Sequence, residues 1–139
     1  MDAQTDQVQI AGSVLVAEDN ATMRQMLAAF CRQWGAEVIE CVNGVEAVQA
    51  FARHQPAWVL MDVAMPEMDG LVATARIKAQ FPQARILMVT QYDSDGLRQA
   101  AQQAGACAYV LKEDLPDVPK WIAAHQDLAS NLMSCPEPE

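Results

Sequence analysis

The sequence has few of the residues on which nucleic-acid surfaces and hydrolase sites depend. Of its 139 residues two are histidines, and nine are lysine or arginine against eighteen acidic residues, which gives a formal net charge of −9. A nucleic-acid surface needs basic side chains to displace the counterions of the phosphate backbone, so this charge argues against direct nucleic-acid binding by this chain. It does not exclude a partner domain that binds DNA. His54 and His125 are far apart in the chain, and neither supports a serine or cysteine nucleophile, so hydrolase chemistry has no support.

Long apolar runs, paired cysteines and glycine-rich loops are also missing. No apolar run approaches the roughly 20 residues that a membrane span needs, and no basic segment followed by an apolar run opens the sequence. We therefore expect no membrane association and a cytoplasmic location. The four cysteines show no CxxC spacing, and we expect reduced thiols that mostly fill the core. The lack of a glycine-rich phosphate loop counts against a nucleotide-binding enzyme.

What is present is an alternation of short apolar runs with segments of helical periodicity. The apolar runs are too short for helices and are expected as strands, at residues 14–17, 38–39, 58–61, 86–89 and 107–111. Helices are expected between them and after the last one, at about residues 20–34, 45–54, 69–80, 94–104 and 118–125. Asn43-Gly44 is expected as a turn. Five repeats of strand then helix predict a doubly wound α/β fold, with a five-stranded parallel sheet and helices on both faces.

No internal linker, repeat or low-complexity tract divides the chain, so we expect one domain. We place it at residues 13–130, after a flexible N-terminal segment at 1–12 and before a C-terminal tail or linker start at 131–139.

Polar side chains follow the carboxyl ends of four of the five expected strands, where open parallel sheets bind their ligands. Glu18 and Asp19 end the first strand, Asp62 the third, Thr90 the fourth and Lys112 the fifth. If the strand order is 2-1-3-4-5, the first and third strands are neighbours. The three carboxylates then crowd together, and Thr90 and Lys112 lie along the same edge.

Three neighbouring carboxylates repel one another unless a cation lies between them. Mg²⁺ is such a cation, because it takes oxygen ligands and keeps several waters, so that two or three carboxylates and one backbone carbonyl suffice. Together with an ammonium and a hydroxyl, this set suits a phosphoryl group that an accessible carboxylate can attack. Each residue alone has an ordinary explanation as part of a turn or cap. Their combination on four strand ends favours a phosphoryl site.

Four motifs resemble those of response-regulator receiver domains of two-component systems: LVAEDN, VLMDVAMPEMDG, ILMVT and AYVLK. The resemblance covers about residues 14–128. It implies the flavodoxin-like receiver fold with strand order 2-1-3-4-5. It also implies a phosphoacceptor switch in phosphorelay signal transduction. Asp62 would take a phosphoryl group from a phosphohistidine on a sensor histidine kinase or phosphotransfer protein.

The resemblance also implies a magnesium cofactor and the residues that hold it. The metal would be bound by Asp19, by Asp62 and by the backbone carbonyl of Ala64, with Glu18 acting through water. Thr90 and Lys112 would contact the phosphoryl oxygens.

Phosphorylation would be transmitted by a switch, again by resemblance. Tyr109 would turn inward as Thr90 moves toward the phosphoryl group, and the face formed by the fourth helix, fifth strand and fifth helix would regulate an output protein or a covalently linked effector domain. That face includes Arg98, Gln102, Tyr109 and Trp121. The first helix and the loop near Leu115-Pro116 would meet the phosphodonor. The sequence leaves open whether a homodimer forms.

The sequence departs from the common receiver pattern beside two of these residues. Lys112 is followed by Glu113 where most receivers have proline, and Thr90 is followed by Gln91 where a small residue is usual. Gln91 could narrow access to the site. Ala64 and Tyr92 occupy positions that tune phosphate lifetime in the family.

Two other functions remain as alternatives. The first is a phosphorylation-independent, receiver-like interaction module, which Glu113 and Gln91 favour slightly and the intact acidic site opposes. The second is a small phosphotransfer enzyme with an aspartyl-phosphate intermediate, which usually needs a second Asp where this chain has Ala64. A flavin binder of the same topology is disfavoured by the acidic loop after the first strand. We expect no enzymatic activity beyond the protein's own phosphorylation and dephosphorylation.

Overall fold

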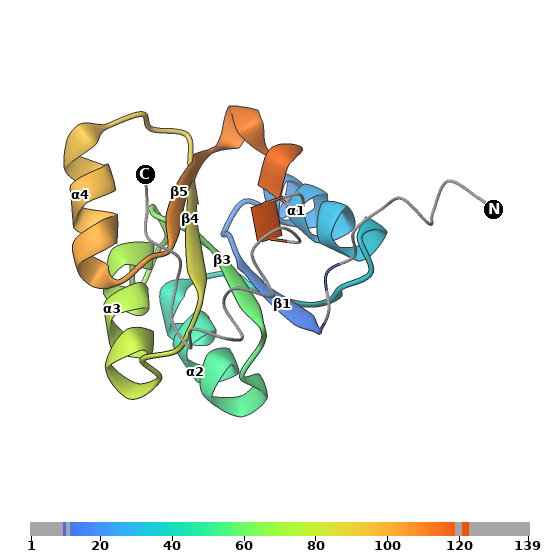
Figure 1. Ribbon diagram of the computed structural model, residues 1–139, viewed down its shortest axis with the longest axis horizontal. Coiled ribbons are helices and arrows are strands. Elements are labelled where there is room, and N and C mark those ends of the chain that lie inside the picture. Colours follow the sequence, from blue (N-terminus) through green and yellow to red (C-terminus); the bar gives the residue numbers. More distant parts are fainter. Residues whose placement is uncertain (1–9, 11, 119–120, 123–139) are drawn as a thin grey trace.

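The structure, a computed structural model, describes residue 10, residues 12–118 and residues 121–122. The elements in this part of the chain are β1 (Ser13–Ala17), α1 (Ala21–Gln33), β2 (Glu37–Cys41), α2 (Gly44–His54), β3 (Trp58–Asp62), α3 (Gly70–Gln80), β4 (Ile86–Thr90), α4 (Asp95–Ala104), β5 (Ala108–Leu111) and a 3₁₀ turn, η2 (Lys112–Asp114). The strands form one parallel sheet in the order β2-β1-β3-β4-β5 (Figure 1). The predicted fold and strand order are therefore confirmed. Of the helix expected around residues 118–125 the structure describes only residues 118, 121 and 122, which are helical. Most of segment 1–12 and the tail at 131–139 lie outside the described residues.

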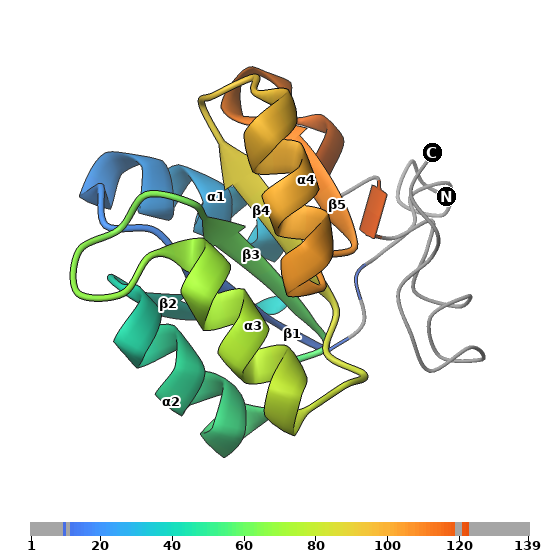
Figure 2. The ribbon, with the colours of Figure 1, turned by 90° about the vertical axis from the view of Figure 1, so that its left-hand side faces the viewer.

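Alternate strand residues face opposite sides of the sheet, and each side is covered by helices. Val14 and Val16 of β1 belong to a buried cluster that includes residues of α1, whereas Leu15 and Ala17 belong to a second cluster with residues of α2, α3 and α4. Figure 2 shows these three helices side by side over one face of the sheet, with α1 behind it. β1, β3 and β4 are central strands and almost wholly buried, which explains their continuous apolar sequences.

Each of the four α-helices in the described chain begins with a side chain that accepts a hydrogen bond from a backbone N–H of the first turn. The capping residues are Asn20, Asn43, Asp69 and Ser94, all of them types that favour this position. The expected turn at Asn43-Gly44 is therefore wrong. Asn43 caps α2, and Gly44 is the first residue of that helix.

Gly70 brings the start of α3 against the end of β3. Its N–H donates to the carbonyl of Val63 at 2.8 Å, and a Cβ at this position would lie 1.9 Å from the carbonyl oxygen of Asp62. No larger residue fits without moving that backbone. The packing therefore fixes the strand end that carries Asp62.

The cysteines differ from one another. Cys31 and Cys41 are free and buried, as expected of core thiols. Cys107 is also buried but is disulfide-bonded, so the prediction of a reduced thiol is wrong for this residue. Within the described residues, no helix is both long and apolar enough to cross a membrane.

Candidate functional site

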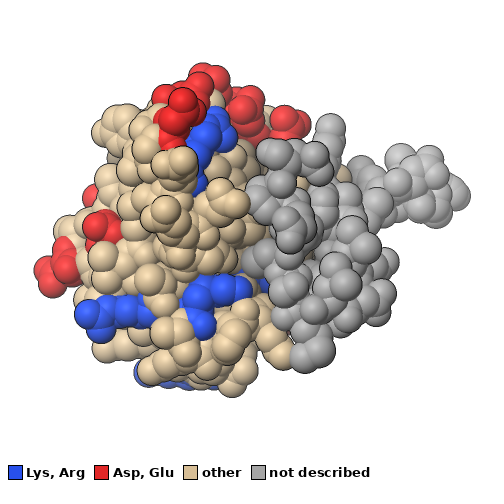
Figure 3. All heavy atoms as spheres, turned by 60° about the vertical axis from the view of Figure 1, so that its left-hand side comes forward, with Lys and Arg blue, Asp and Glu red and all other residues tan. Residues whose placement is uncertain are grey.

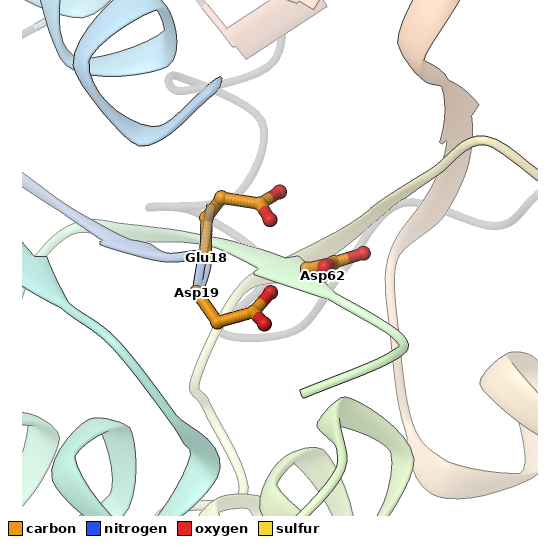
Figure 4. A group of neighbouring side chains, drawn as sticks. All are labelled: Glu18, Asp19 and Asp62. Carbon is orange, nitrogen blue, oxygen red and sulfur yellow. The ribbon is translucent and has the colours of Figure 1, made fainter. Parts of the chain in front are cut away.

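Three carboxylates meet where β1 and β3 end. The two strands pair in parallel with Ala17 opposite Met61, so the next residues, Glu18 and Asp62, emerge side by side. Asp19 follows in the loop to α1. Carboxylate oxygens of Glu18, Asp19 and Asp62 lie within 4.8 Å of one another, and Figure 4 shows the three side chains gathered at this edge. The prediction that these three carboxylates lie close together is therefore confirmed.

The burial of the three carboxylates is unequal. Glu18 is 1% exposed and Asp62 6% exposed, whereas Asp19 faces solvent. The backbone N–H of Asn20 donates to Glu18 Oε2 at 3.2 Å. Two carboxylates are therefore largely desolvated beside a third that incoming solutes can reach.

Lys112 supplies the positive charge at this site. Its Nζ lies 2.9 Å from Glu18 Oε1 and 3.6 Å from Asp62 Oδ1. Lys112 stands at the start of η2, directly after β5. Because the sheet is parallel, the end of β5 lies at the same edge of the sheet as the ends of β1 and β3. Burial lowers the pKa of Lys112, but its contacts with Glu18 and Asp62 outweigh that effect and the net pKa is raised. The ammonium therefore stays charged and links the two buried carboxylates.

The Asp62 carboxyl holds its proton unusually tightly. Burial and the neighbouring charge of Glu18 raise its pKa to about 7, although Lys112 and the backbone N–H of Ala64 act in the opposite direction. One ammonium is not enough to neutralise two buried carboxylates and a third beside them.

The donor set fits a hard divalent cation. Oxygen ligands are what Mg²⁺ prefers, and a cation among these carboxylates would relieve the repulsion that raises the pKa of Asp62. Glu18, Asp19 and Asp62 could each offer an oxygen. Figure 3 shows a group of acidic side chains at the top of the molecule, the end toward which β4 and β5 run. Most basic side chains on this face lie nearer the opposite end. This distribution favours the approach of a cation to that edge.

Thr90 is linked to Tyr109 through the backbone of Tyr92. The N–H of Tyr92 donates to Thr90 Oγ1 at 3.2 Å, and Tyr109 Oη donates to the carbonyl oxygen of Tyr92 at 2.5 Å. The guanidinium of Arg98 lies 4.7 Å from the centre of the Tyr109 ring and pairs with Asp93 at 3.0 Å. A movement of the Thr90 hydroxyl would thus disturb the segment that holds Tyr109.

Four other residues that the sequence predicted for the site or the output face differ in their exposure to solvent. Ala64, Gln91 and Tyr92 are exposed on the segments that follow Asp62 and Thr90. Trp121, expected on the output face, is half-buried, and its ring packs edge-on against Trp58 at 5.5 Å.

Two contacts were not foreseen from the sequence: the direct ion pair between Lys112 and Glu18, and the link through the Tyr92 peptide. Both depend on side-chain directions across elements, for which the sequence carries no local signal.

Known proteins resemble this chain in both sequence and fold. The model of the response regulator receiver domain matches residues 14–122. The chemotaxis protein CheY of Bacillus subtilis is 38% identical over 104 residues, which are 74% of this chain and 87% of CheY. The transcriptional regulatory protein PdtaR of Mycobacterium tuberculosis is 40% identical over 100 residues, 71% of this chain and 48% of PdtaR. The chain thus spans most of one relative and about half of the other.

Solved structures agree with these matches. A DNA-binding response regulator of the LuxR family from Staphylococcus aureus superposes with a TM-score of 0.78 at 26% identity, covering 83% of this chain and 98% of that one. A CheY-like receiver domain protein from Methanospirillum hungatei gives a TM-score of 0.81 at 21% identity, over 86% and 97% of the two chains, and supports the fold alone.

Sheet order, acidic strand ends and sequence matches all define the same class, that of phosphoacceptor signalling domains. The chain belongs to the response regulator receiver domain family of two-component systems.

Proposed function

We propose that this protein is a phosphorylation-dependent switch and that Asp62 is its phosphoacceptor. The observation that carries the proposal is the position of the Asp62 carboxylate, which ends a buried strand beside Glu18, Asp19 and Lys112. Its backbone is held by Gly70. A carboxylate held rigidly by its strand and aimed at an edge that binds cations suits attack on an incoming phosphoryl group.

In the proposed reaction, an Asp62 oxygen attacks the phosphorus of a phosphohistidine on a sensor kinase or phosphotransfer protein. A P–O bond forms as the P–N bond breaks, and the leaving imidazole takes up a proton. Glu18, Asp19 and Asp62, with the Ala64 carbonyl, would hold Mg²⁺, which would neutralise charge on the transferring group. Lys112 would pair with a phosphoryl oxygen, and the Thr90 hydroxyl would donate to another.

The output step would use the path from Thr90 to Tyr109. When Thr90 turns toward the phosphoryl group, the hydrogen bond from the Tyr92 N–H to its oxygen must be remade. The Tyr92 carbonyl also holds Tyr109, so the two side chains would move together. We propose that the face formed by α4 and β5 then regulates an output protein or a linked effector domain.

The direct test is the intact mass of the protein after incubation with phosphoramidate. The wild type, Asp62→Asn and, as a matched control, Asp95→Asn should be compared with Mg²⁺ and with a chelator. Asp95 is exposed in the first turn of α4.

The proposal predicts a gain of one phosphoryl group that needs Mg²⁺, survives in Asp95→Asn and is absent from Asp62→Asn. No gain in folded wild type would contradict it and favour the phosphorylation-independent interaction module. An equal gain in Asp62→Asn would assign the acceptor elsewhere.

A further inference from the structure

Arg24 joins two strand ends beside the acidic site. It lies in α1, one turn after the loop that carries Glu18 and Asp19. Its Nη1 donates to the backbone carbonyl of Glu18 at 3.0 Å, and its Nε donates to Glu40 Oε1 at 3.2 Å. The Arg24 side chain is only 16% exposed. One guanidinium therefore contacts the end of β1 and the end of β2 at once.

The peptide that Arg24 contacts is the one that leads from Glu18 into Asp19. The Glu18 N–H is already bound to the carbonyl of Cys41 at 3.0 Å, so the contact with Arg24 occupies the carbonyl of the same residue. Because the peptide is planar, fixing its orientation also places the Cα of Asp19 and limits the directions that the Asp19 side chain can take.

Glu40 keeps the guanidinium in place. Its second carboxylate oxygen lies 3.3 Å from Nη2 of Arg32, a side chain that is 54% exposed. Arg24 and Arg32 thus share one acceptor. In the described contacts only Arg24 also reaches the acidic loop.

We propose that Arg24 is a positioning residue for the metal site, and that it holds the Glu18–Asp19 peptide so that both carboxylates face Asp62 before a cation arrives. This inference rests on the proposed Mg²⁺-dependent phosphorylation. It gives a role in the site to a residue other than the three carboxylates, Thr90 and Lys112.

The sign of the effect separates positioning from charge. A guanidinium near three carboxylates adds positive charge, which by itself opposes cation binding. Removing Arg24 would then strengthen Mg²⁺ binding if charge were its main effect. If it acts by holding the peptide, removing it weakens Mg²⁺ binding although a positive charge is lost.

The experiment is a Mg²⁺ titration of the full chain followed by amide chemical shifts of the acidic loop. Arg24→Met removes both the charge and the contacts, whereas Arg24→Lys keeps the charge but cannot make both contacts with one ammonium. Arg32→Met is the matched control, because it removes a contact to Glu40 without touching the Glu18 carbonyl. We expect both Arg24 variants to bind Mg²⁺ about tenfold more weakly, as is typical when a partner of a metal-ligand segment is lost, and Arg32→Met to match the wild type.

A second readout separates positioning from loss of fold. At saturating Mg²⁺ the phosphorylation rate of Arg24→Met should return to near that of the wild type, which a damaged fold would not allow. If Arg24→Met does not fold, Arg24→Lys carries the test, because it keeps the positive charge and loses the paired contacts.

Unchanged or tighter binding in the folded variants would overturn the role of Arg24 while leaving the proposed function intact. A folded wild type that binds no Mg²⁺ would overturn both.

Discussion

Replacing Asp62 with asparagine should stabilise the metal-free protein at pH 8. The pKa of Asp62 is raised to about 7, first by burial and then by Glu18, so the folded state binds this proton more tightly than the unfolded chain does. Each pKa unit corresponds to about 1.4 kcal/mol, which places the cost of ionising Asp62 in the folded state at no more than about 4 kcal/mol. Because Glu18 and Lys112 respond to the change, we expect Asp62→Asn to be more stable by about 1–2 kcal/mol.

The sign of the pH dependence follows from the same shift. The contribution of Asp62 to the free energy of unfolding is favourable while the folded protein keeps the proton. This contribution is lost as the pH rises through about 7. The stability of the wild type relative to Asp62→Asn should therefore fall between about pH 4, the ordinary carboxyl pKa, and about pH 7, and change little above that. Mg²⁺ should reverse the difference, because only the wild type keeps the full carboxylate set.

Urea denaturation in a chelator, followed by the fluorescence of the fully buried Trp58, measures this directly. Asp95→Asn serves as the control. The Asp95 carboxylate is exposed, so its removal should leave the pH profile of stability unchanged. Equal or lower stability of Asp62→Asn at pH 8 would refute the account of Asp62 as a carboxylate that repels its neighbours.

Four further substitutions test the structure and access to the site. Gly70→Ala should cost about 3 kcal/mol or more in unfolding free energy, because its Cβ would meet the Asp62 carbonyl. Gly96→Ala in α4 is the control: its Cβ would make only an ordinary contact with Ser94 Oγ, at 3.7 Å, so this variant should gain about 0.5–1 kcal/mol. Equal effects of the two substitutions in urea denaturation would contradict this. Gln55→Gly should raise stability by up to about 1 kcal/mol, because Gln55 ends α2 at a φ of +44°; a loss would count against the left-handed cap. Gln91→Ala should change the rate of phosphorylation or of phosphate loss, measured by intact mass over time, and no change in either would remove Gln91 as a determinant of access.

Most of the fold could be predicted from the sequence because its central strands are buried on both faces. β3 and β4 appear as unbroken apolar runs, and their ends are marked by Asp62 and Thr90. The start of α2 could not be predicted so well. Asn followed by Gly is typical of turns, but the same Asn side chain can cap a helix, and tertiary packing of Gly44 against Met68 decides between them. The disulfide of Cys107 has no signal in the cysteine spacing.

The composition of the candidate site followed from parallel strand ends meeting at one edge. The sequence alone therefore predicts that Glu18 and Asp62 lie together. It could not reveal that Lys112 pairs with Glu18 or that Arg24 joins Glu18 to Glu40. Glu40 is 16 residues from Arg24, and their contact depends on how α1 lies against β2.

The central claim is that Asp62 carries the phosphoryl group as an acyl phosphate. The most direct test is to phosphorylate the protein with phosphoramidate and Mg²⁺, reduce it with borohydride, and map the product by tandem mass spectrometry. Reduction of an aspartyl phosphate leaves homoserine, so the account predicts homoserine at position 62 and only in the phosphorylated sample. Homoserine at Asp19 or elsewhere, or an unmodified Asp62 in protein that has gained a phosphoryl group, would contradict it.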